Sequence, residues 1–187
     1  MAFLQQRGGY RNLKVYRLSE AIYDITYYFT HKYLQAGDRT VDQMVQAARS
    51  GKQNIAEGSA AATTSREMEI KLTNVAKASL QELLVDYEDY LRVRRLVQWS
   101  ASHARYEPMR RYLKSEQFMH GYASLLEKLN DEELANMSIT LIHQTDYLLQ
   151  RLIEKQQELF VAEGGIREQM TQARVKYRNS DRNTTGR

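Results

Sequence analysis

The chain has 187 residues, enough for one domain with a sizeable core, and its 27 basic and 23 acidic side chains give a net charge of +4. It contains no cysteine, which excludes disulfides, thiolate metal sites and cysteine nucleophiles. One proline and nine glycines in a sequence otherwise rich in helix-forming residues predict long helices and no strands. No apolar run suits a signal peptide or approaches the roughly 20 residues of a membrane span, so we expect a soluble, cytoplasmic protein.

The charge is distributed unevenly along the chain. Residues 1–60 carry eight basic and five acidic side chains, and residues 164–187 carry six and two. Residues 131–163 carry two basic and seven acidic side chains. This polarisation favours a partner with an anionic face, such as RNA or DNA, without requiring one.

The first helix is predicted over residues 13–34, where apolar side chains recur every three or four positions, and Gly37 follows its end. A second stripe on this helix, formed by Tyr16, Tyr23 and Tyr27, makes its apolar face wider than one core requires. An exposed aromatic face is typical of a subunit interface. Tyrosines at the edge of a core, with their hydroxyls in water, explain the same pattern equally well.

The second helix is predicted over residues 40–57, with Gly58 at the position of a left-handed C-terminal cap. Thr64 and Glu67 have the spacing of a capping box, which predicts a third helix from about residue 65 that continues past residue 92 and extends as far as Trp99. Small side chains would let these two helices approach closely. They are Ala47, Ala48, Ser50, Gly51, Ala56, Ala76, Ala78 and Ser79.

Between residues 100 and 130 the pattern weakens, and Pro108 and Gly121 interrupt it. We interpret this segment as a helical insertion packed on the other helices through Tyr112, Leu113, Phe118, Leu125 and Leu129.

The last long helix is predicted to begin at a cap formed by Asn130 or Asp131 and to end at Gly164. Residues 166–178 predict a short basic amphipathic helix, and residues 180–187 are expected to be disordered. The pattern as a whole predicts an all-α fold: an antiparallel up-down four-helix bundle over residues 1–163, with a helical insertion at about 100–130, followed by a basic C-terminal helix and tail over 164–187.

The sequence contains no recognisable catalytic motif. The four histidines have no metal-ligand spacing, no Glu-x-x-His pair of a di-iron bundle is present, and the common nucleotide-binding and hydrolase motifs are missing. Glu57, Glu82 and Asp86 are better explained as solvated or ion-paired side chains than as paired catalytic acids. We therefore expect no enzyme activity, no cofactor and no metal site.

The most informative stretch lies between residues 42 and 84. It contains Gln43, the alanines 47 and 48, Ser50, the pentapeptide Asn54-Ile55-Ala56-Glu57-Gly58, and then Ala76, Ser79 and Glu82. In these residues the chain resembles the four-helix-bundle proteins encoded in intervening sequences of 23S ribosomal RNA genes, a family that also includes the accessory variability determinants of diversity-generating retroelements. The resemblance covers about residues 12–91 and, more loosely, the last long helix.

The motif itself is interpreted mainly as a folding and packing element, in which Asn54 and Glu57 would cap or tie the turn between the second and third helices. A direct contact of Asn54, Glu57, Gly58, Ser79 and Glu82 with a ligand is the alternative. Gly51, the length of residues 92–130 and the segment after Gly164 depart from the family pattern.

The resemblance implies a bundle that assembles into a ring, commonly a homopentamer, whose basic surface binds nucleic acid and, in retroelements, a reverse transcriptase. Phosphate contacts position a nucleic acid without reading its sequence, and an aromatic side chain among cations can stack on a base. The candidate contacts are Arg11, Lys14, Arg17, Arg49, Lys52, Arg174, Lys176, Tyr177 and Arg178.

The sequence thus predicts a non-enzymatic, homo-oligomeric accessory protein that binds nucleic acid, RNA in particular. The alternative for the basic side chains is that they only solvate the surface. The alternative function is a protein-binding scaffold for a partner enzyme such as a reverse transcriptase, through the acidic last helix and the tyrosine stripe.

Overall fold

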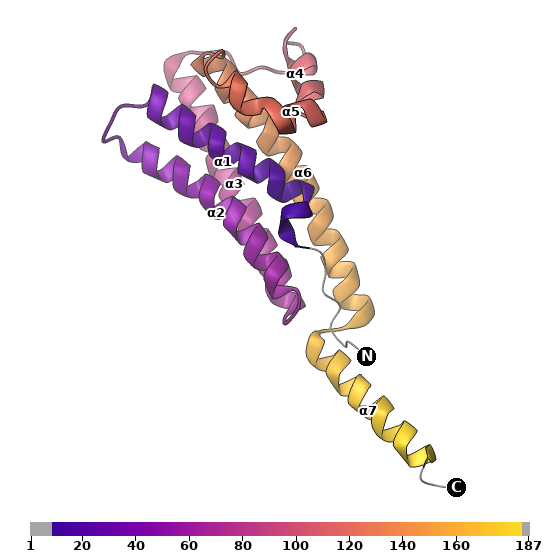
Figure 1. Ribbon diagram of the computed structural model, residues 1–187. Helices are drawn as coiled ribbons and strands as arrows, with labels where there is room; N and C mark the ends of the chain where they lie inside the picture. Colours follow the sequence, from indigo (N-terminus) through magenta and orange to yellow (C-terminus); the bar gives the residue numbers. More distant parts are fainter. Residues whose placement is uncertain (1–8, 185–187) are drawn as a thin grey trace.

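The computed structural model describes residues 9–184, of which 180–184 are described by their backbone alone. This part of the chain is helical and contains no strand, as the sequence predicts (Figure 1). None of its helices is long and apolar enough to cross a membrane. In chain order the helices are η1 (Tyr10–Asn12), α1 (Lys14–Tyr33), α2 (Arg39–Ala61), α3 (Arg66–Arg94), α4 (Tyr106–Tyr112), α5 (Glu116–Gly121), η2 (Tyr122–Leu125), α6 (Asp131–Glu163) and α7 (Ile166–Thr184).

The longest helices pack in the pairs α1–α2, α2–α3, α3–α6 and α1–α6. Contacts along two of these pairs give the direction of the helices. The α carbons of Gly51 and Gly58 in α2 lie against α3 at Leu80 and Leu72, so later positions in α2 meet earlier positions in α3. In α3 and α6, Gln81 bonds to Asp146 at 2.8 Å and Thr73 bonds to Gln156 at 3.1 Å. Both pairs are therefore antiparallel.

The core lies between these four helices and includes fully buried side chains from each of them. An aromatic cluster occupies the end near the α1–α2 turn, where the ring centroid of Phe29 is 5.0 Å from that of Tyr87 and 4.7 Å from that of Tyr90. Burial of side chains of this size stabilises a fold by about 1.5–3 kcal/mol each. Leu113 and Phe118, two of the predicted anchors of the insertion, join the same core.

The predicted ends of the second and third helices need correction. α2 continues through Gly58 to Ala61, so Gly58 is not its cap. A Cβ atom at Gly58 would lie 3.3 Å from the carbonyl oxygen of Glu69, so this glycine lets α2 approach the backbone of α3. α3 is capped by Ser65, whose hydroxyl accepts the Met68 N–H at 3.2 Å. The predicted box of Thr64 and Glu67 is therefore wrong by one residue.

α3 also ends earlier than Trp99. Arg95 adopts the left-handed conformation with φ 58°, and the N–H of Leu96 bonds to the carbonyl of Leu91 at 2.9 Å. This arrangement satisfies a free carbonyl at the helix end and turns the chain away from the axis of α3. Leu96 to Trp99 consequently form no regular secondary structure, and they lead into the insertion.

The predicted ends of α6 are confirmed. Asn130 accepts the Glu133 N–H at 2.8 Å and the Glu133 carboxylate accepts the Asn130 N–H at 3.0 Å, a reciprocal capping box. Gly164, with φ 70°, ends the helix. α7 then leaves the rest of the molecule at the end opposite to α4 and α5 (Figure 1). α7 continues to Thr184, beyond the end predicted at residue 178, and residues 185–187 of the tail predicted to be disordered lie outside the described residues.

Candidate nucleic-acid interface

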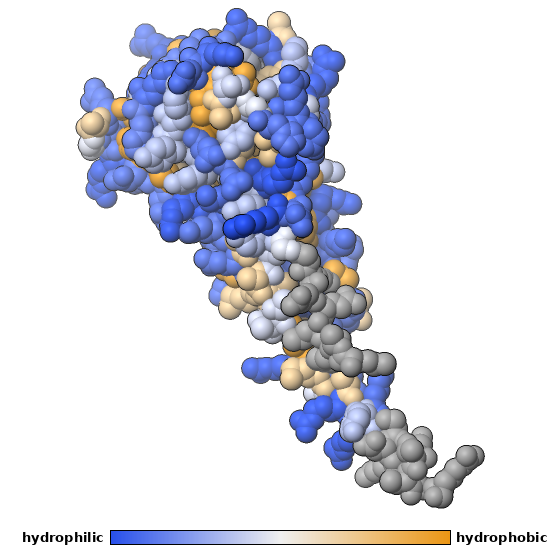
Figure 2. All heavy atoms as spheres, in the orientation of Figure 1, coloured by the Kyte–Doolittle hydropathy of each residue, from blue (hydrophilic) through white to orange (hydrophobic). Residues whose placement is uncertain are grey.

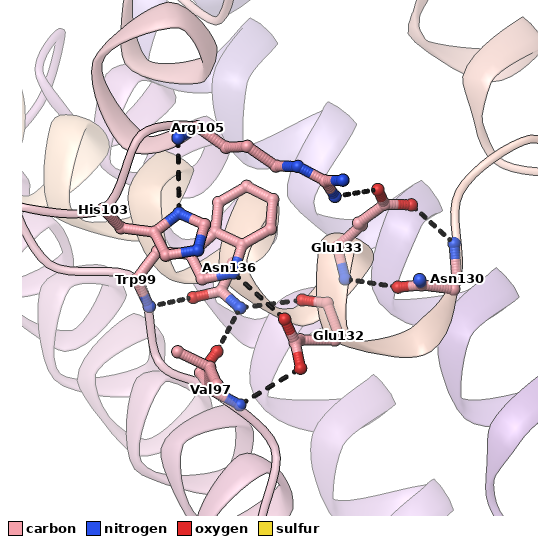
Figure 3. Close-up of polar contacts among 8 residues, drawn as sticks. All are labelled: Val97, Trp99, His103, Arg105, Asn130, Glu132, Glu133 and Asn136. Carbon is pink, nitrogen blue, oxygen red and sulfur yellow. Dashed lines mark hydrogen bonds and ion pairs between the residues drawn. The ribbon is translucent and has the colours of Figure 1, made fainter.

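The insertion is attached to α6 by a polar network around Trp99 (Figure 3). The Trp99 backbone N–H donates to Asn136 Oδ1 at 2.7 Å, and its indole N–H donates to Glu132 Oε1 at 3.1 Å. Asn136 Nδ2 donates in turn to the carbonyls of Val97 and Glu132, at 2.8 and 2.9 Å. Because Trp99 is buried, each of these groups would be costly to leave without a partner.

Two further side chains continue this attachment into the insertion (Figure 3). The ring of His103 stacks on Trp99 with centroids 4.7 Å apart and an interplanar angle of 10°. The Arg105 guanidinium lies 5.7 Å from the Trp99 ring centroid and bonds to Glu133 at 2.7 Å. Since α4 begins at Tyr106, this network sets where α4 starts relative to α6.

A cleft of about 530 Å³ opens between α1, α4 and α6. Its lining includes the buried Leu18 and Thr140 together with half-buried or exposed cationic, aromatic and amide side chains. The lining residues are Lys14, Leu18, Tyr106, Arg110, Lys114, Thr140, His143, Gln144, Tyr147 and Leu148. Three permanent cations and one histidine therefore face a single depression whose lining residues include no carboxylate.

The α4 wall of this cleft is held by hydrogen bonds. Gln144 Nε2 donates to the carbonyl oxygen of Arg110 at 3.2 Å, which joins α4 to α6. The Arg110 guanidinium contacts both carboxylate oxygens of Glu107, at 3.0 and 3.1 Å, and both side chains of this pair are about half exposed. A pair of that exposure contributes little to stability, so an anionic ligand can compete with Glu107 for Arg110.

The predicted contacts at the start of the first helix lie in different settings. Lys14 is exposed and lines the cleft. Arg17 lies 3.8 Å from Glu116 of α5, so it faces the insertion as half of an ion pair. Arg11 is exposed in η1, and its guanidinium carbon lies 5.7 Å from the ring centroid of Tyr10. Only Lys14 of these three therefore belongs to the cleft.

The cations predicted on the second helix are separate from the cleft lining. Lys52 Nζ lies 4.2 Å from the ring centroid of Tyr23, so the ammonium group packs on an aromatic face of α1. Arg49 is exposed on the same helix. These two side chains form a small basic surface on α2.

The predicted contacts on the C-terminal helix form a third basic surface. Arg174, Lys176, Tyr177 and Arg178 are all exposed on α7. Hydrophilic side chains project from both sides of α7 in Figure 2, and the wide end of the molecule is also mostly hydrophilic on this face. The structure therefore divides the predicted contacts among the cleft, α2 and α7 and does not bring them together at one site.

The motif residues of α2 and α3 form hydrogen bonds within α2 and between the two helices. Asn54 Nδ2 donates to the carbonyl oxygen of Ser50 at 2.9 Å and to its hydroxyl at 3.1 Å, and the Ser50 hydroxyl is 3.0 Å from that of Ser79. Asn54 and Glu57 both lie inside α2, so neither caps the turn after it, and the capping part of that prediction is wrong. Glu57 and Glu82 are exposed.

A shallow groove of about 610 Å³ runs beside this polar contact and is lined by Ser50, Ser79 and Glu82 among others. Asp86 also lines it, and partial burial raises the pKa of the Asp86 carboxyl, with Asp89 and Glu82 adding to the effect. Three acidic residues, Asp42, Glu82 and Asp86, line this groove and no basic residue does, so the groove is unsuited to a phosphate backbone.

The tyrosine stripe of α1 is partly covered by the chain itself. Tyr16 meets Tyr10 edge-on with ring centroids 4.7 Å apart, and Tyr23 lies beneath Lys52. Tyr27 stacks on His31 at 4.1 Å and is 50% exposed. Of the three, Tyr27 keeps the largest exposed surface.

Sequence reasoning missed most of the cleft. Arg110, Lys114, His143 and Tyr147 come from two segments that are distant in sequence and meet only because the insertion folds back onto α6. Arg110 and Lys114 are four residues apart, as are His143 and Tyr147, and this spacing places each pair on one helical face. That spacing was the sequence signal from which the cleft could have been predicted.

No protein-family model, no curated protein and no solved structure matches the chain. Within the described residues, no three histidine, aspartate or glutamate side chains are grouped so that they could hold a metal ion.

Proposed function

We propose that this chain is a non-enzymatic accessory protein that binds nucleic acid, RNA in particular, in the cytoplasm. The observation that carries the proposal is the cleft between α1, α4 and α6, where Lys14, Arg110 and Lys114 face one depression without a carboxylate in its lining. Phosphate groups are the partners that such a surface attracts most strongly.

The basic side chains of α7 extend this interface. Four cations and one acid occupy residues 166–179, and their side chains stand on a helix that projects from the rest of the molecule (Figure 1). Cations of this kind hold a backbone without reading its sequence, and Tyr177 adds a ring on which a base can stack. The nucleic acid would therefore be held with little sequence preference.

The proposal includes a four-helix bundle formed by α1, α2, α3 and α6, of the kind found in the 23S intervening-sequence proteins. Supporting it are the antiparallel pairs described above and the contact of Ser50 with Ser79, two motif residues on adjacent helices. On the same proposal the bundle assembles into a homo-oligomer, a pentamer by the family resemblance. The exposed ring of Tyr27 supports an interface on α1.

The second candidate function is a scaffold for a partner enzyme such as a reverse transcriptase. Two exposed apolar or aromatic side chains on the acidic helix α6 favour it, since Val161 is 83% exposed and Tyr147 is 65% exposed. Binding to such a partner would depend on apolar contacts and would change little with salt. Salt dependence therefore separates the two candidates.

The proposal is tested by fluorescence anisotropy of a labelled single-stranded RNA titrated with the protein at increasing salt. We expect binding at low salt and a linear fall of the logarithm of the affinity with the logarithm of the salt concentration. A protein that binds no nucleic acid at low salt would refute the proposal. The same titration with single-stranded DNA and duplex RNA defines the preferred nucleic acid.

A further inference from the structure

The cleft differs from the other two basic surfaces in how its charge is arranged. On α2 and α7 the cations are spread along the outside of one helix, an arrangement suited to successive phosphates of a nucleic-acid backbone. In the cleft, Lys14 comes from α1, Arg110 from α4 and Lys114 from the segment after α4, and all three line one depression. Cations that come from separate segments and face one volume are suited to a ligand whose negative charge is concentrated at one point.

We infer that this cleft binds the phosphorylated end of a single-stranded nucleic acid, that is, one terminal nucleotide with its phosphomonoester. The inference rests on the proposed function and specifies the ligand of one part of the interface. A phosphomonoester carries about −1.5 to −2 charges at pH 7 and three acceptor oxygens, whereas each internal phosphodiester carries a single charge. Three convergent cations therefore favour the end of a strand over its interior.

The size of the cleft supports a ligand of one nucleotide. Its volume of about 530 Å³ lies in the range of small-molecule sites, roughly 300–1,000 Å³, and is too small for a length of strand. Its lining is apolar at Leu18 and Leu148 and includes the rings of Tyr106 and Tyr147. Leu148, Tyr106 and Tyr147, which unlike Leu18 are not fully buried, provide a surface for a base and its sugar beside the cationic phosphate site.

The walls of the cleft are held in place before a ligand binds. The bond between Gln144 and the Arg110 carbonyl joins the two walls, and the Trp99 network fixes the start of the insertion. Glu107, which contacts Arg110 from outside the lining, is the internal anion that a phosphate would replace. Such pre-organisation reduces the ordering cost of binding.

The inference is tested with one RNA sequence prepared in three forms: with a 5′-phosphate, with a 3′-phosphate, and with hydroxyls at both ends. We expect one phosphorylated form to bind at least about tenfold more tightly than the hydroxyl form. Comparison of the two phosphorylated forms tells which end is bound. The corresponding nucleoside monophosphate should compete for that form, and the unphosphorylated nucleoside should not.

Two variants assign the effect to the cleft. Lys114→Gln should remove the preference for the phosphorylated end, and it should lower the affinity for the hydroxyl form only by the loss of one phosphate contact. Arg111→Gln is the matched control, because Arg111 is an exposed cation of the same segment that does not line the cleft. It should keep the preference. Both substitutions are at exposed positions, and a circular dichroism melt checks that the variants remain folded.

The outcomes separate this inference from the proposed function. Equal affinities for all three RNA forms, with the usual salt dependence, would overturn the inference and leave the proposed function standing. Binding of the monophosphate without any binding of hydroxyl-ended RNA would support the cleft and refute nucleic-acid binding along a backbone. A preference that survives Lys114→Gln would show that the phosphate binds elsewhere and would also overturn the inference.

Discussion

Gly51 of α2 lies directly against the side chain of Leu80 of α3. A Cβ atom at Gly51 would be 2.7 Å from Leu80 Cδ2 and 2.9 Å from Leu80 Cγ, and Leu80 is fully buried. The two helices can approach this closely only because position 51 has no side chain. Gly51 thus has a packing role in this chain.

Gly51→Ala should lower the free energy of unfolding by about 1–2 kcal/mol. Overpacking of a core costs about 1–3 kcal/mol, and the higher helix propensity of alanine offsets up to about 1 kcal/mol of this cost. Urea denaturation measures the loss. The control is Gly121→Ala, at a helical glycine with nothing within 4 Å of the added Cβ, which should change stability by less than about 0.5 kcal/mol. Equal effects at the two positions would contradict the close packing of α2 and α3.

Asn136→Ala should destabilise the chain by about 2–3 kcal/mol, because it removes the acceptor of the buried Trp99 N–H and the donor to the Val97 carbonyl. The insertion should also become faster in amide hydrogen exchange, since it loses its attachment to α6. Asn74→Ala is the control, because the exposed Asn74 makes one bond, to the Ile70 carbonyl on its own helix. Unchanged exchange in the insertion would show that the Trp99 network does not hold it.

The stability should fall at high pH through Tyr87. Burial raises the pKa of the Tyr87 phenol from its ordinary value near 10 to about 12, although its hydroxyl bonds to Thr26 at 3.0 Å. Between these values the folded chain keeps a proton that the unfolded chain loses. The contribution is therefore complete below pH 10 and is lost as the pH rises toward 12, a loss of about 2–3 kcal/mol.

Denaturation of the wild type and of Tyr87→Phe at several pH values from 9 to 12 checks this expectation. The phenylalanine ring keeps the contact with Phe29, so the variant should be somewhat less stable at pH 9 and should lose less stability up to pH 12. All other titrating groups are common to both proteins. Parallel curves for the two proteins would mean that the Tyr87 phenol does not titrate differently on folding.

Tyr27→Ser should weaken self-association if α1 forms the subunit interface. Sedimentation equilibrium at micromolar concentration should give the mass of a homo-oligomer for the wild type and a lower mass for the variant. Tyr147→Ser is the matched control, because Tyr147 is a similarly exposed tyrosine on α6. A wild-type monomer at this concentration would contradict the proposed assembly.

Periodicity predicted the helices well, and local caps with strong signals, such as Asn130 with Glu133, were placed correctly. Two of the errors came from contacts that no local pattern contains. Gly58 resembles a helix end in sequence, but it is a position where α2 meets the backbone of α3. In the same way the cleft depends on the insertion folding back onto α6, so Lys14 was selected without its neighbours Lys114 and His143.

The salt dependence of RNA binding by a charge variant tests the proposed function most directly. Lys14→Gln, Arg174→Gln and Arg178→Gln together remove cations from the cleft and from α7, and Lys71→Gln, Arg111→Gln and Lys128→Gln remove three exposed cations outside the predicted contacts. We expect the slope of log affinity against log salt to become shallower by about 2 in the first variant, at about 0.7 per lost contact with a single strand, and to stay near the wild-type value in the second. Equal slopes in both variants would contradict binding through these surfaces.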